Sequence, residues 1–283
     1  MPTLAGRVAI VAGGTRGAGR GIALALGDAG ATVYVTGRSS RRGGKPKDGS
    51  PETVEDAAAQ VTKRGGRGIA VRVDHTREPE VRRLFERVDR DEGRLDVLVN
   101  AVWGGNEDYR ALGWGKPFWT QPTTGWPQMM EAGVLAYLLA SREALPRMKR
   151  RKRGLIVCVL DGINVPYRGH MYWDLAHLCM ERMIFGMHPD VRDDGVVAMG
   201  VSPGFMRTER VQRILRTKAQ RHAQGYDRSE STEYVGRGIA AVAADPRGAR
   251  WGGKLVHSAD LADYYGFTDI DGRRVPRFVV ANP

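Results

Sequence analysis

A glycine-rich turn near the N-terminus has the residue types and the spacing needed to bind phosphate. Gly13, Gly17 and Gly19 follow the apolar run 8–12, and a helical pattern begins at Gly19. Glycines permit a tight turn and let backbone N–H groups approach a pyrophosphate at the N-terminus of a helix. Because a buried strand precedes this turn, and a second strand begins about twenty residues further on, the sequence predicts a dinucleotide site.

Two arginines indicate which dinucleotide is bound. Arg16 lies inside the turn, and Arg38 follows the second expected strand, 32–36. An acidic residue at the end of that strand would bind the ribose 2′-hydroxyl of NAD, whereas guanidinium groups pair bidentately with a 2′-phosphate. We therefore expect NADP(H), with NAD as the less favoured alternative.

The glycine spacing of this turn resembles that of the short-chain dehydrogenase/reductase family, and the resemblance extends along nearly the whole chain. Asp74 and His75 match the adenine edge after the third strand, and residues 202–208 match the loop whose threonine contacts the nicotinamide carboxamide. Asn100 matches the first residue of the family's Asn-Asn-Ala-Gly motif, although Ala-Val-Trp at 101–103 replaces the rest. The resemblance implies a cofactor site formed by Gly13, Thr15, Arg16, Gly17, Gly19, Arg38, Asp74, His75, Asn100, Pro203, Gly204 and Thr208.

The positions that carry the family's reaction hold different residues in this chain. The family uses a tyrosine as general acid/base, a lysine four residues later, a serine that orients the carbonyl, and an asparagine in a proton relay. Tyr172 is followed at that spacing by Ala176. Counting back from Pro203 by the family's usual separation gives Trp173 and His177 instead, and the Tyr172 register needs a one-residue deletion. We favour the Trp173/His177 register, and either register breaks the tetrad.

A different set of polar groups remains. In the favoured register Asp161 stands at the serine position and Gly133 at the asparagine position. Asp161 and His177 are predicted to approach one cavity, with Tyr172 on the helix between their elements, and a His–Asp pair is a workable acid/base near neutral pH. Trp173 cannot shuttle a proton, because its indole only donates. The alternative interpretation is that His177 packs against the ribose and Asp161 caps a turn.

Three functions fit these observations. The first is an NADP(H)-dependent oxidoreductase whose proton donor has moved to His177, Tyr172 or Asp161. The second is a redox-neutral enzyme, such as a cyclase, isomerase or dehydratase, that keeps the nucleotide site without hydride transfer. The third is a non-enzymatic nucleotide sensor or DNA-associated regulator, motivated by the net charge of +12. The family resemblance favours the first.

Aromatic residues are dense in the loop 103–126, which a doubly wound fold places beside the substrate crevice. They indicate a large, flat or apolar small-molecule substrate, while packing in the core or at a dimer interface competes equally. The segment 263–269 is expected to cover the same crevice or to pack on a partner subunit. The aromatic residues of the loop are Trp103, Tyr109, Trp114, Phe118, Trp119 and Trp126.

Short apolar runs alternate with helical patterns from end to end, which is typical of a doubly wound parallel sheet. Each run is expected to be a strand buried on both faces. The expected strands are 8–12, 32–36, 69–73, 97–100, 155–160, 196–201 and 254–257. The expected helices are 19–29, 51–64, 79–92, 125–149, 172–191 and 232–244, with another inside 208–231. The sequence thus predicts one α/β domain over 1–283, a Rossmann fold with a seven-stranded sheet in three α/β/α layers.

The amino-acid composition limits the kinds of partner that the protein is expected to bind. An apolar fraction of 42% allows a sizeable core, and 44 Lys and Arg against 32 acidic residues give the net charge of +12. The basic residues are spread along the chain, so no nucleic-acid partner is expected. We expect no signal peptide, membrane span or metal site, and a cytoplasmic location. Cys158 and Cys179 are expected to be buried free thiols, and the resemblance implies a homodimer or homotetramer.

Overall fold

Seven strands run parallel in one sheet. They are β1 (Val8–Ala12), β2 (Thr32–Gly37), β3 (Arg67–Arg72), β4 (Val97–Asn100), β5 (Gly154–Val159), β6 (Val196–Ser202) and β7 (Leu255–His257). Their order across the sheet is β3-β2-β1-β4-β5-β6-β7. The computed structural model describes residues 3–44, 49–105, 107, 111–163, 166–223 and 225–278. The parallel pairing and the strand order confirm the predicted doubly wound parallel sheet.

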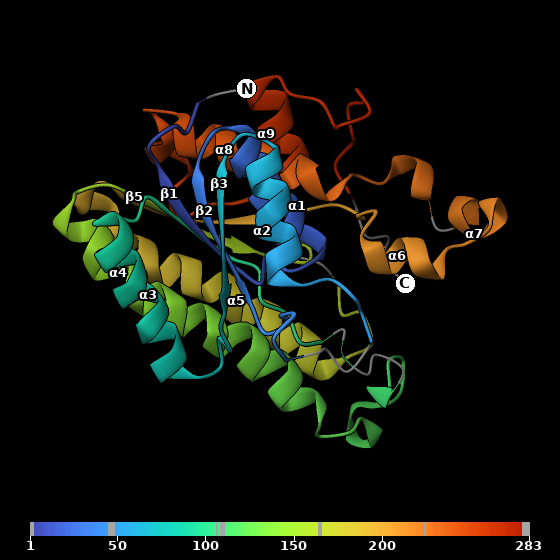
Figure 1. Cartoon of the computed structure of the whole chain (residues 1–283). Helices are drawn as coiled ribbons and strands as arrows, with labels where there is room; N and C mark the ends of the chain where they lie inside the picture. The colour runs from blue at the N-terminus through green and yellow to red at the C-terminus, as the bar shows by residue number, and fades with distance from the viewer. Residues whose placement is uncertain are drawn as a thin grey trace.

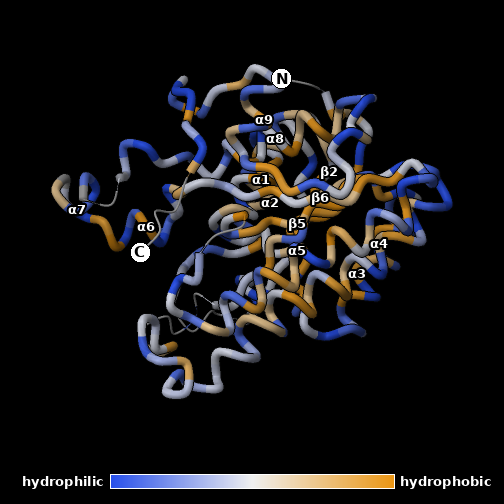
Figure 2. Tube along the Cα trace, turned by 180° about the vertical axis from the view of Figure 1, so that it is seen from behind, coloured by the Kyte–Doolittle hydropathy of each residue, from blue (hydrophilic) through white to orange (hydrophobic). Residues whose placement is uncertain are grey.

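Helices cover both faces of the sheet (Figure 1). One face carries α1 (Gly17–Asp28), α2 (Val54–Lys63), α8 (Thr232–Ala244) and α9 (Ser258–Tyr265), and the other carries α3 (Glu78–Glu92), α4 (Ala136–Arg150) and α5 (Met171–Val191). The side chains of β1 alternate between the two cores: Ala9 and Val11 join the first, and Val8 and Ile10 the second. Figure 2 shows the hydrophobic residues concentrated in the strands between these layers. The three-layer arrangement follows from this alternation.

The edge strand β3 departs from the expectation that every strand is buried on both faces. Its inner residues are half-buried, and Arg67 and Arg72 at its ends are exposed. The strand pairs only with β2, so one of its sides has no neighbouring strand to cover it. Burial on both faces is correct for β1 and β4, which lie in the middle of the sheet.

Two connecting segments differ from the expected helices. Residues 125–149 form a π-helical segment, Pro127–Leu135, followed by α4, and the backbone at Ala132 (φ −83°, ψ 24°) leaves the helical region. The segment 208–231 holds two short helices, α6 (Glu209–Ile214) and α7 (Lys218–Ala223), which project away from the layers (Figure 1). Within the residues described, no helix combines the length and the apolar character needed to cross a membrane.

The order of the strands determines where a ligand can bind. From β1 the chain passes outward to β2 and β3, and it then returns to place β4 on the opposite side of β1. In open α/β sheets the crevice at such a reversal, outside the carboxyl ends of the strands, is the usual ligand site. The glycine turn follows β1 directly and so lies at this reversal.

Candidate active site

A cavity of about 610 Å³ opens at the carboxyl ends of the central strands. Every predicted cofactor residue except Asn100 lines its wall: Gly13, Thr15, Arg16, Gly17, Gly19, Arg38, Asp74, His75, Pro203, Gly204 and Thr208. Asp161, Trp173 and His177 line the same cavity. The fold therefore gathers residues from both halves of the chain around one space.

The glycine turn is built so closely that side chains cannot be accommodated. Gly13 has φ of +83°, and a Cβ added there would lie 2.5 Å from the carbonyl oxygen of Ala101. A Cβ on Gly19 would lie 2.2 Å from the carbonyl oxygen of Gly13. The glycines thus let the turn pack closely on the backbone that follows β4 and on the start of α1, so that the N-terminus of α1 faces the cavity as a phosphate site requires.

Three arginines, from the glycine turn and from the ends of β2 and β3, line the cavity. Arg16 and Arg38 were expected there, and Arg72 is an addition. The pairing of Gly37 with Arg72 in the β2–β3 register places Arg72 beside the start of the Arg38 segment. Arg38 forms an ion pair with Glu107, which also lines the cavity. This end of the cavity is therefore rich in cations, with one carboxylate that competes for Arg38.

Asp74 and His75 form the wall after β3. Burial raises the pKa of Asp74, but hydrogen bonds from the Thr76 N–H (3.0 Å) and O–H (2.8 Å) outweigh it and hold this pKa below its usual range. Burial lowers the pKa of His75 to about 4. The Thr36 hydroxyl donates to the Val11 carbonyl, so His75 Nε2, 2.8 Å from that hydroxyl, carries the ring proton. Because its pKa is about 4, His75 is neutral at physiological pH and carries its single ring proton on Nε2.

Asn100 lies behind the cavity and does not line it. Its side chain is fully buried, and its Nδ2 donates to the hydroxyl of Ser141 on α4 at 3.1 Å. The same nitrogen lies 3.9 Å from Cys158 Sγ on β5. These contacts tie β4 to α4 and β5. Cys158 is buried as expected, whereas Cys179 is only half-buried.

Trp173 and His177 lie stacked on the wall, with ring centroids 4.1 Å apart. His177 Nδ1 is 2.9 Å from the carbonyl oxygen of Trp173, and a carbonyl only accepts, so Nδ1 carries the proton. Burial lowers the pKa of His177, opposed by the negative charge of Asp161. At neutral pH the other nitrogen, Nε2, is therefore unprotonated and can accept a hydrogen bond or a proton from a ligand.

Asp161 lines the cavity without touching His177. Its side chain is 59% exposed and pairs with Arg168 at 3.4 Å, and the guanidinium of Arg168 also lies over the Trp173 ring at 4.9 Å. In the described part of the chain no hydrogen bond joins Asp161 to His177. The expected acid/base pair is thus reduced to an electrostatic influence across the cavity.

Tyr172 lies away from the cavity wall. Its ring contacts those of Trp126 and His170, with centroids 6.2 Å and 5.7 Å away. Ala176, its partner in the less favoured register, is buried in the core. The geometry accordingly brings Trp173 and His177 to the cavity and leaves Tyr172 outside it.

Tyr137 on α4 is a wall residue that sequence reasoning missed. Its hydroxyl donates to the carbonyl of Val159 at 2.9 Å, and burial raises its pKa well above the usual value. The position lies one helical turn beyond Gly133, on the face that the family resemblance already marks as facing the site. That spacing was the available signal.

The Trp103 ring packs against Gly133, the position at which the family resemblance leads one to expect an asparagine. A Cβ added at Gly133 would lie 3.1 Å from Cζ3 and 3.2 Å from Cε3 of the Trp103 ring. The same ring meets His177 edge-on, with centroids 4.8 Å apart. The indole of Trp103 thus fills the space beside Gly133 and packs against the ring of His177.

Only part of the aromatic loop shapes the cavity. Trp103 and Trp114 line it, whereas Phe118, Trp119 and Trp126 are 56%, 75% and 48% exposed and lie outside it. Tyr109 lies outside the described residues. Among the described aromatic residues of the loop, Trp103 and Trp114 are therefore the two in a position to contact a ligand in the cavity.

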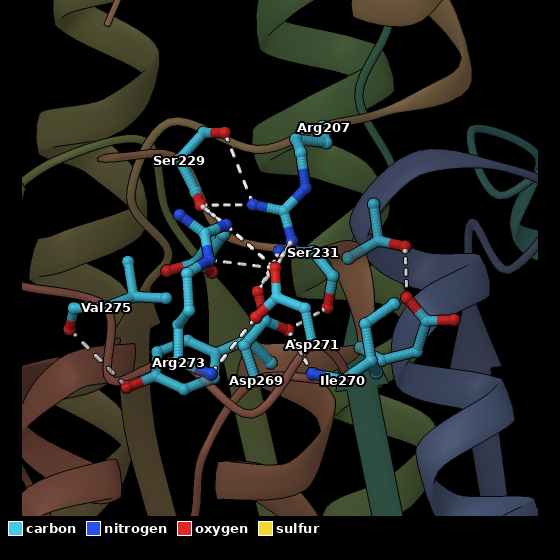
Figure 3. Close-up of polar contacts among 12 residues, drawn as sticks. Arg207, Ser229, Ser231, Asp269, Ile270, Asp271, Arg273 and Val275 are labelled. Atoms are coloured by element: carbon cyan, nitrogen blue, oxygen red, sulfur yellow. Dashed lines mark hydrogen bonds and ion pairs between the residues drawn. The ribbon is translucent and has the colours of Figure 1, made fainter. Parts of the chain in front are cut away.

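The segment 263–269 packs within its own chain and does not line the cavity. Tyr264 and Tyr265 contact Trp251, and Asp269 pairs with Arg207 at 2.8 Å. Figure 3 shows Asp269 between the Arg207 guanidinium and Ser231. This contact anchors the C-terminal segment beneath the loop that follows β6.

Glu209, at the start of α6, is another wall residue that the sequence did not indicate. Its Oε2 accepts a hydrogen bond from the Gly17 N–H at 2.8 Å, and its Oε1 pairs with Arg20 at 3.1 Å. Arg213 on the same helix pairs with Glu52 at 2.6 Å. These contacts tie α6 to the start of α1 and to Glu52, two residues before α2. Among the described residues, no group of three or more His, Cys, Asp or Glu side chains could hold a metal ion.

Comparison with known proteins agrees with the fold and the site. Residues 7–219 match the model of the short chain dehydrogenase family. The chain is 33% identical over 278 residues to "Dehydrogenase/reductase SDR family member 1" of Mus musculus, covering 95% of this chain and 85% of that protein. It is 26% identical over 240 residues to "Hydroxynaphthalene reductase arp2" of Aspergillus fumigatus, covering 84% and 79%.

A solved structure shares the whole architecture. The crystal structure of a putative dehydrogenase from Xanthomonas campestris superposes with a TM-score of 0.79 at 21% identity, covering 99% of this chain and 98% of that one. This structural similarity establishes the fold, and the match to the family model establishes the relationship at the level of sequence. The chain belongs to the short-chain dehydrogenase family, a family of oxidoreductase enzymes.

Proposed function

We propose that this protein is an NADP(H)-dependent oxidoreductase with an atypical active site, acting on a fairly large or aromatic alcohol or carbonyl compound. One observation carries the proposal. A single cavity runs from the arginines at the end of β2, past the glycine turn, to Thr208 and a wall of aromatic rings. Such a cavity suits a dinucleotide with a substrate placed at its nicotinamide end.

The charges at the adenosine end support NADP over NAD. Arg16, Arg38 and Arg72 line that end, and guanidinium groups bind a 2′-phosphate with paired hydrogen bonds. Close backbone packing at Gly13 and Gly19 excludes a Cβ at either position, as expected for a glycine turn that binds a pyrophosphate. The residues present thus fit NADP(H), which would supply the hydride chemistry.

His177 is our candidate for the proton-transfer group. Its protonated Nδ1 is engaged by the Trp173 carbonyl, which leaves Nε2 to accept the hydroxyl proton of an alcohol. A neutral imidazole is suited to removing a proton, and the lowered pKa of His177 keeps it neutral. The arrangement therefore favours alcohol oxidation over carbonyl reduction.

The aromatic wall supports a flat substrate. Trp103, Trp114 and Trp173 line the cavity beside His177, and aromatic rings pack well against other flat rings. The relative named as a hydroxynaphthalene reductase is consistent with this class. We therefore propose polycyclic or aromatic alcohols and ketones as the first compounds to test.

The test is the change in NADPH absorbance with a panel of such alcohols (with NADP⁺) and ketones (with NADPH). We expect turnover with at least one compound, and a loss of about 10²- to 10⁴-fold in kcat for His177→Ala. Glu78→Gln, an exposed change on α3, serves as the matched control and should retain full activity. Absence of turnover across the panel in both directions would count against the proposal.

A redox-neutral enzyme is the second candidate, and the state of Tyr137 favours it. Tyr137 is the one tyrosine on the described wall, and its hydroxyl already donates to the Val159 carbonyl. The family's tyrosine acid has no free counterpart among the described wall residues. Turnover without any change in NADPH absorbance, abolished by Asp161→Asn or His177→Ala, would select this candidate.

We also propose that the protein is a homodimer or homotetramer. Leu138 on α4 and Leu175, Leu178 and Phe185 on α5 are exposed apolar side chains on neighbouring helices. Exposed apolar patches of this kind mark interfaces between proteins. Sedimentation velocity of the wild type and of Leu178→Asp tests this, since the substitution should yield monomers if the patch forms the interface.

A further inference from the structure

Glu230 is a buried carboxylate directly behind the cavity wall. Its residue is 1% exposed, and its Oε2 accepts hydrogen bonds from the Gly204 N–H at 3.0 Å and from the Ser258 hydroxyl at 2.6 Å. Among the described residues, Oε1 has no hydrogen-bond partner. Gly204 itself lines the cavity. The carboxylate thus contacts the wall from the side opposite to the ligand.

The backbone of Glu230 holds the same wall segment. Its N–H donates to the carbonyl of Phe205 at 2.9 Å, and its carbonyl accepts from the N–H of Arg207 at 2.8 Å. A Cβ added at Gly204 would lie 3.3 Å from Glu230 Oε2 and 3.1 Å from Cβ of Phe278. The turn after β6 is therefore held by Glu230 and packs against the C-terminal segment, while its other side faces the cavity.

Fixed charges surround this carboxylate. Asp269 is fully buried and accepts hydrogen bonds from the Arg207 guanidinium and from the Ser231 N–H, each at 2.8 Å (Figure 3). Arg207 from the turn attracts the Glu230 charge, Asp269 from the C-terminal segment opposes it, and Tyr234 on α8 lies within its field. Ser258 supplies the contact from α9.

We propose that Glu230 is a positioning residue for the dinucleotide: its carboxylate fixes Gly204 from behind the cavity wall, and its negative charge favours an oxidised over a reduced nicotinamide ring. The inference rests on the proposed function, in which this turn borders the nicotinamide. The oxidised ring is a cation and the reduced ring is neutral, so a nearby buried anion stabilises the oxidised form.

The charge on Glu230 changes within the physiological range. Burial raises its pKa from 4.5 to about 7, opposed by the hydrogen bonds from Ser258 and Gly204. Below that pKa the group is neutral, and a neutral carboxyl accepts more weakly from the Gly204 N–H than a carboxylate does. The preference for the oxidised dinucleotide should therefore increase as the pH rises through about 7.

The experiment measures dissociation constants of NADPH and NADP⁺ from about pH 5.5 to 8.5 by fluorescence titration and competition. Both forms carry the same phosphates, so their ratio cancels the titration of the 2′-phosphate and of the arginine end. We expect Kd(NADPH)/Kd(NADP⁺) to increase by about three- to tenfold with pH in the wild type. In Glu230→Gln, which keeps an acceptor for Gly204 and cannot titrate, the increase near pH 7 should be absent, and any change at lower pH from protonation of His177 is common to both proteins.

A second variant tests the same assignment without changing the carboxylate. Ser258→Ala removes a hydrogen bond that lowers the pKa of Glu230, so the midpoint of the pH profile should move to higher pH. Glu233→Gln, three residues further along, contacts Arg64 away from the cavity and should leave the profile unchanged.

The outcomes separate the inference from the proposed function. Binding of NADP(H) with the same pH profile in the wild type and in Glu230→Gln would overturn the inference alone. A midpoint that Ser258→Ala leaves in place would also overturn it. Failure of the wild type to bind either nicotinamide dinucleotide at any pH would remove the proposed function together with the inference.

Discussion

The carboxylate of Glu209 accepts a hydrogen bond from the backbone N–H of Gly17, with 2.8 Å between Oε2 and N. Gly17 is the first residue of α1, and the positive end of that helix dipole is where a pyrophosphate would bind. Arg20 pairs with the other oxygen of the same carboxylate at 3.1 Å. Glu209 thus places a negative charge on the phosphate-binding end of α1.

Glu209→Gln should tighten dinucleotide binding. The substitution removes one negative charge beside the pyrophosphate and frees Arg20 from its ion pair, so Kd for NADPH should fall by about three- to tenfold. Fluorescence titration at low and high salt measures this, and the gain should shrink as salt screens the charges. Glu78→Gln removes an exposed charge on α3 and should leave Kd unchanged. Weaker binding by Glu209→Gln would show that the carboxylate supports the bound dinucleotide.

Arg38→Ala should weaken NADPH binding while leaving NADH binding nearly constant. A lost bidentate pair with the 2′-phosphate corresponds to about 1.5–3 kcal/mol, or roughly 10- to 150-fold in Kd. Arg72→Ala should act in the same direction, since the β2–β3 register places it beside Gly37. Equal losses for NADPH and NADH would mean that these arginines do not contact the 2′-phosphate.

Glu107→Gln tests the same end of the cavity in the opposite direction. Glu107 pairs with Arg38, so it competes with a phosphate for that guanidinium. Its removal should tighten NADPH binding by a few-fold and leave NADH binding unaffected. Comparing the two Kd values in one titration series checks this, and a parallel gain for both dinucleotides would contradict it.

Gly133→Asn, which restores the residue type that the family uses, should destabilise the protein. The Trp103 ring lies 3.1 Å from the position of a Cβ at residue 133, and overpacking of this kind costs about 1–3 kcal/mol. Thermal unfolding should therefore give a lower Tm. Gly186→Ala on α5, where an added Cβ meets nothing within 4 Å, is the matched control and should raise Tm slightly. In a Trp103→Ala background, Gly133→Asn should lower Tm less than it does in the wild type, because the ring that it overpacks is gone.

The fold could be predicted because its buried parallel strands are short, nearly continuous apolar runs. The expected bounds of β1 and β4 match the structure, since both strands lie in the middle of the sheet. The exposure of β3 depends on its position at the sheet edge, which residue patterns alone do not give. The π-helical segment lies inside a stretch that the residue pattern predicts as one regular helix.

Some residues of the candidate site could likewise be predicted from the sequence, and others could not. The glycine turn and Arg16 belong to one local motif, so their positions could be inferred from spacing. Glu209 reaches Gly17 across 192 positions of sequence, and nothing near either residue indicates that contact. Glu230 lies 26 positions from Gly204 and appears in the sequence as an ordinary acidic residue before a helix. Long-range contacts of this kind are fixed by the packing of the connecting segments.

Glu230 also makes the stability of the protein depend on pH in a direction opposite to that of most carboxylates. Its pKa is raised by burial from 4.5 to about 7, so the folded state binds its proton more tightly than the unfolded state does. Its favourable contribution is complete below about pH 4.5 and is lost as the pH rises to about 7. Above about pH 7 the free energy of unfolding is therefore lower than below about pH 4.5 by an amount of the order of 3 kcal/mol.

Glu230→Gln removes this dependence, because the amide does not titrate. Relative to the wild type, the variant should gain free energy of unfolding between about pH 4.5 and pH 7, and the difference should level off above that range. Asp96→Asn should show the opposite slope: hydrogen bonds from Arg94 and from the Val8 N–H outweigh burial and hold the pKa of Asp96 below its usual range, so the wild-type advantage should vanish toward low pH. Urea unfolding of the three proteins at several pH values measures both slopes. A difference between the wild type and Glu230→Gln that does not vary with pH would mean that Glu230 keeps one charge state throughout, and the pH-dependent preference for oxidised dinucleotide would then lose its physical basis.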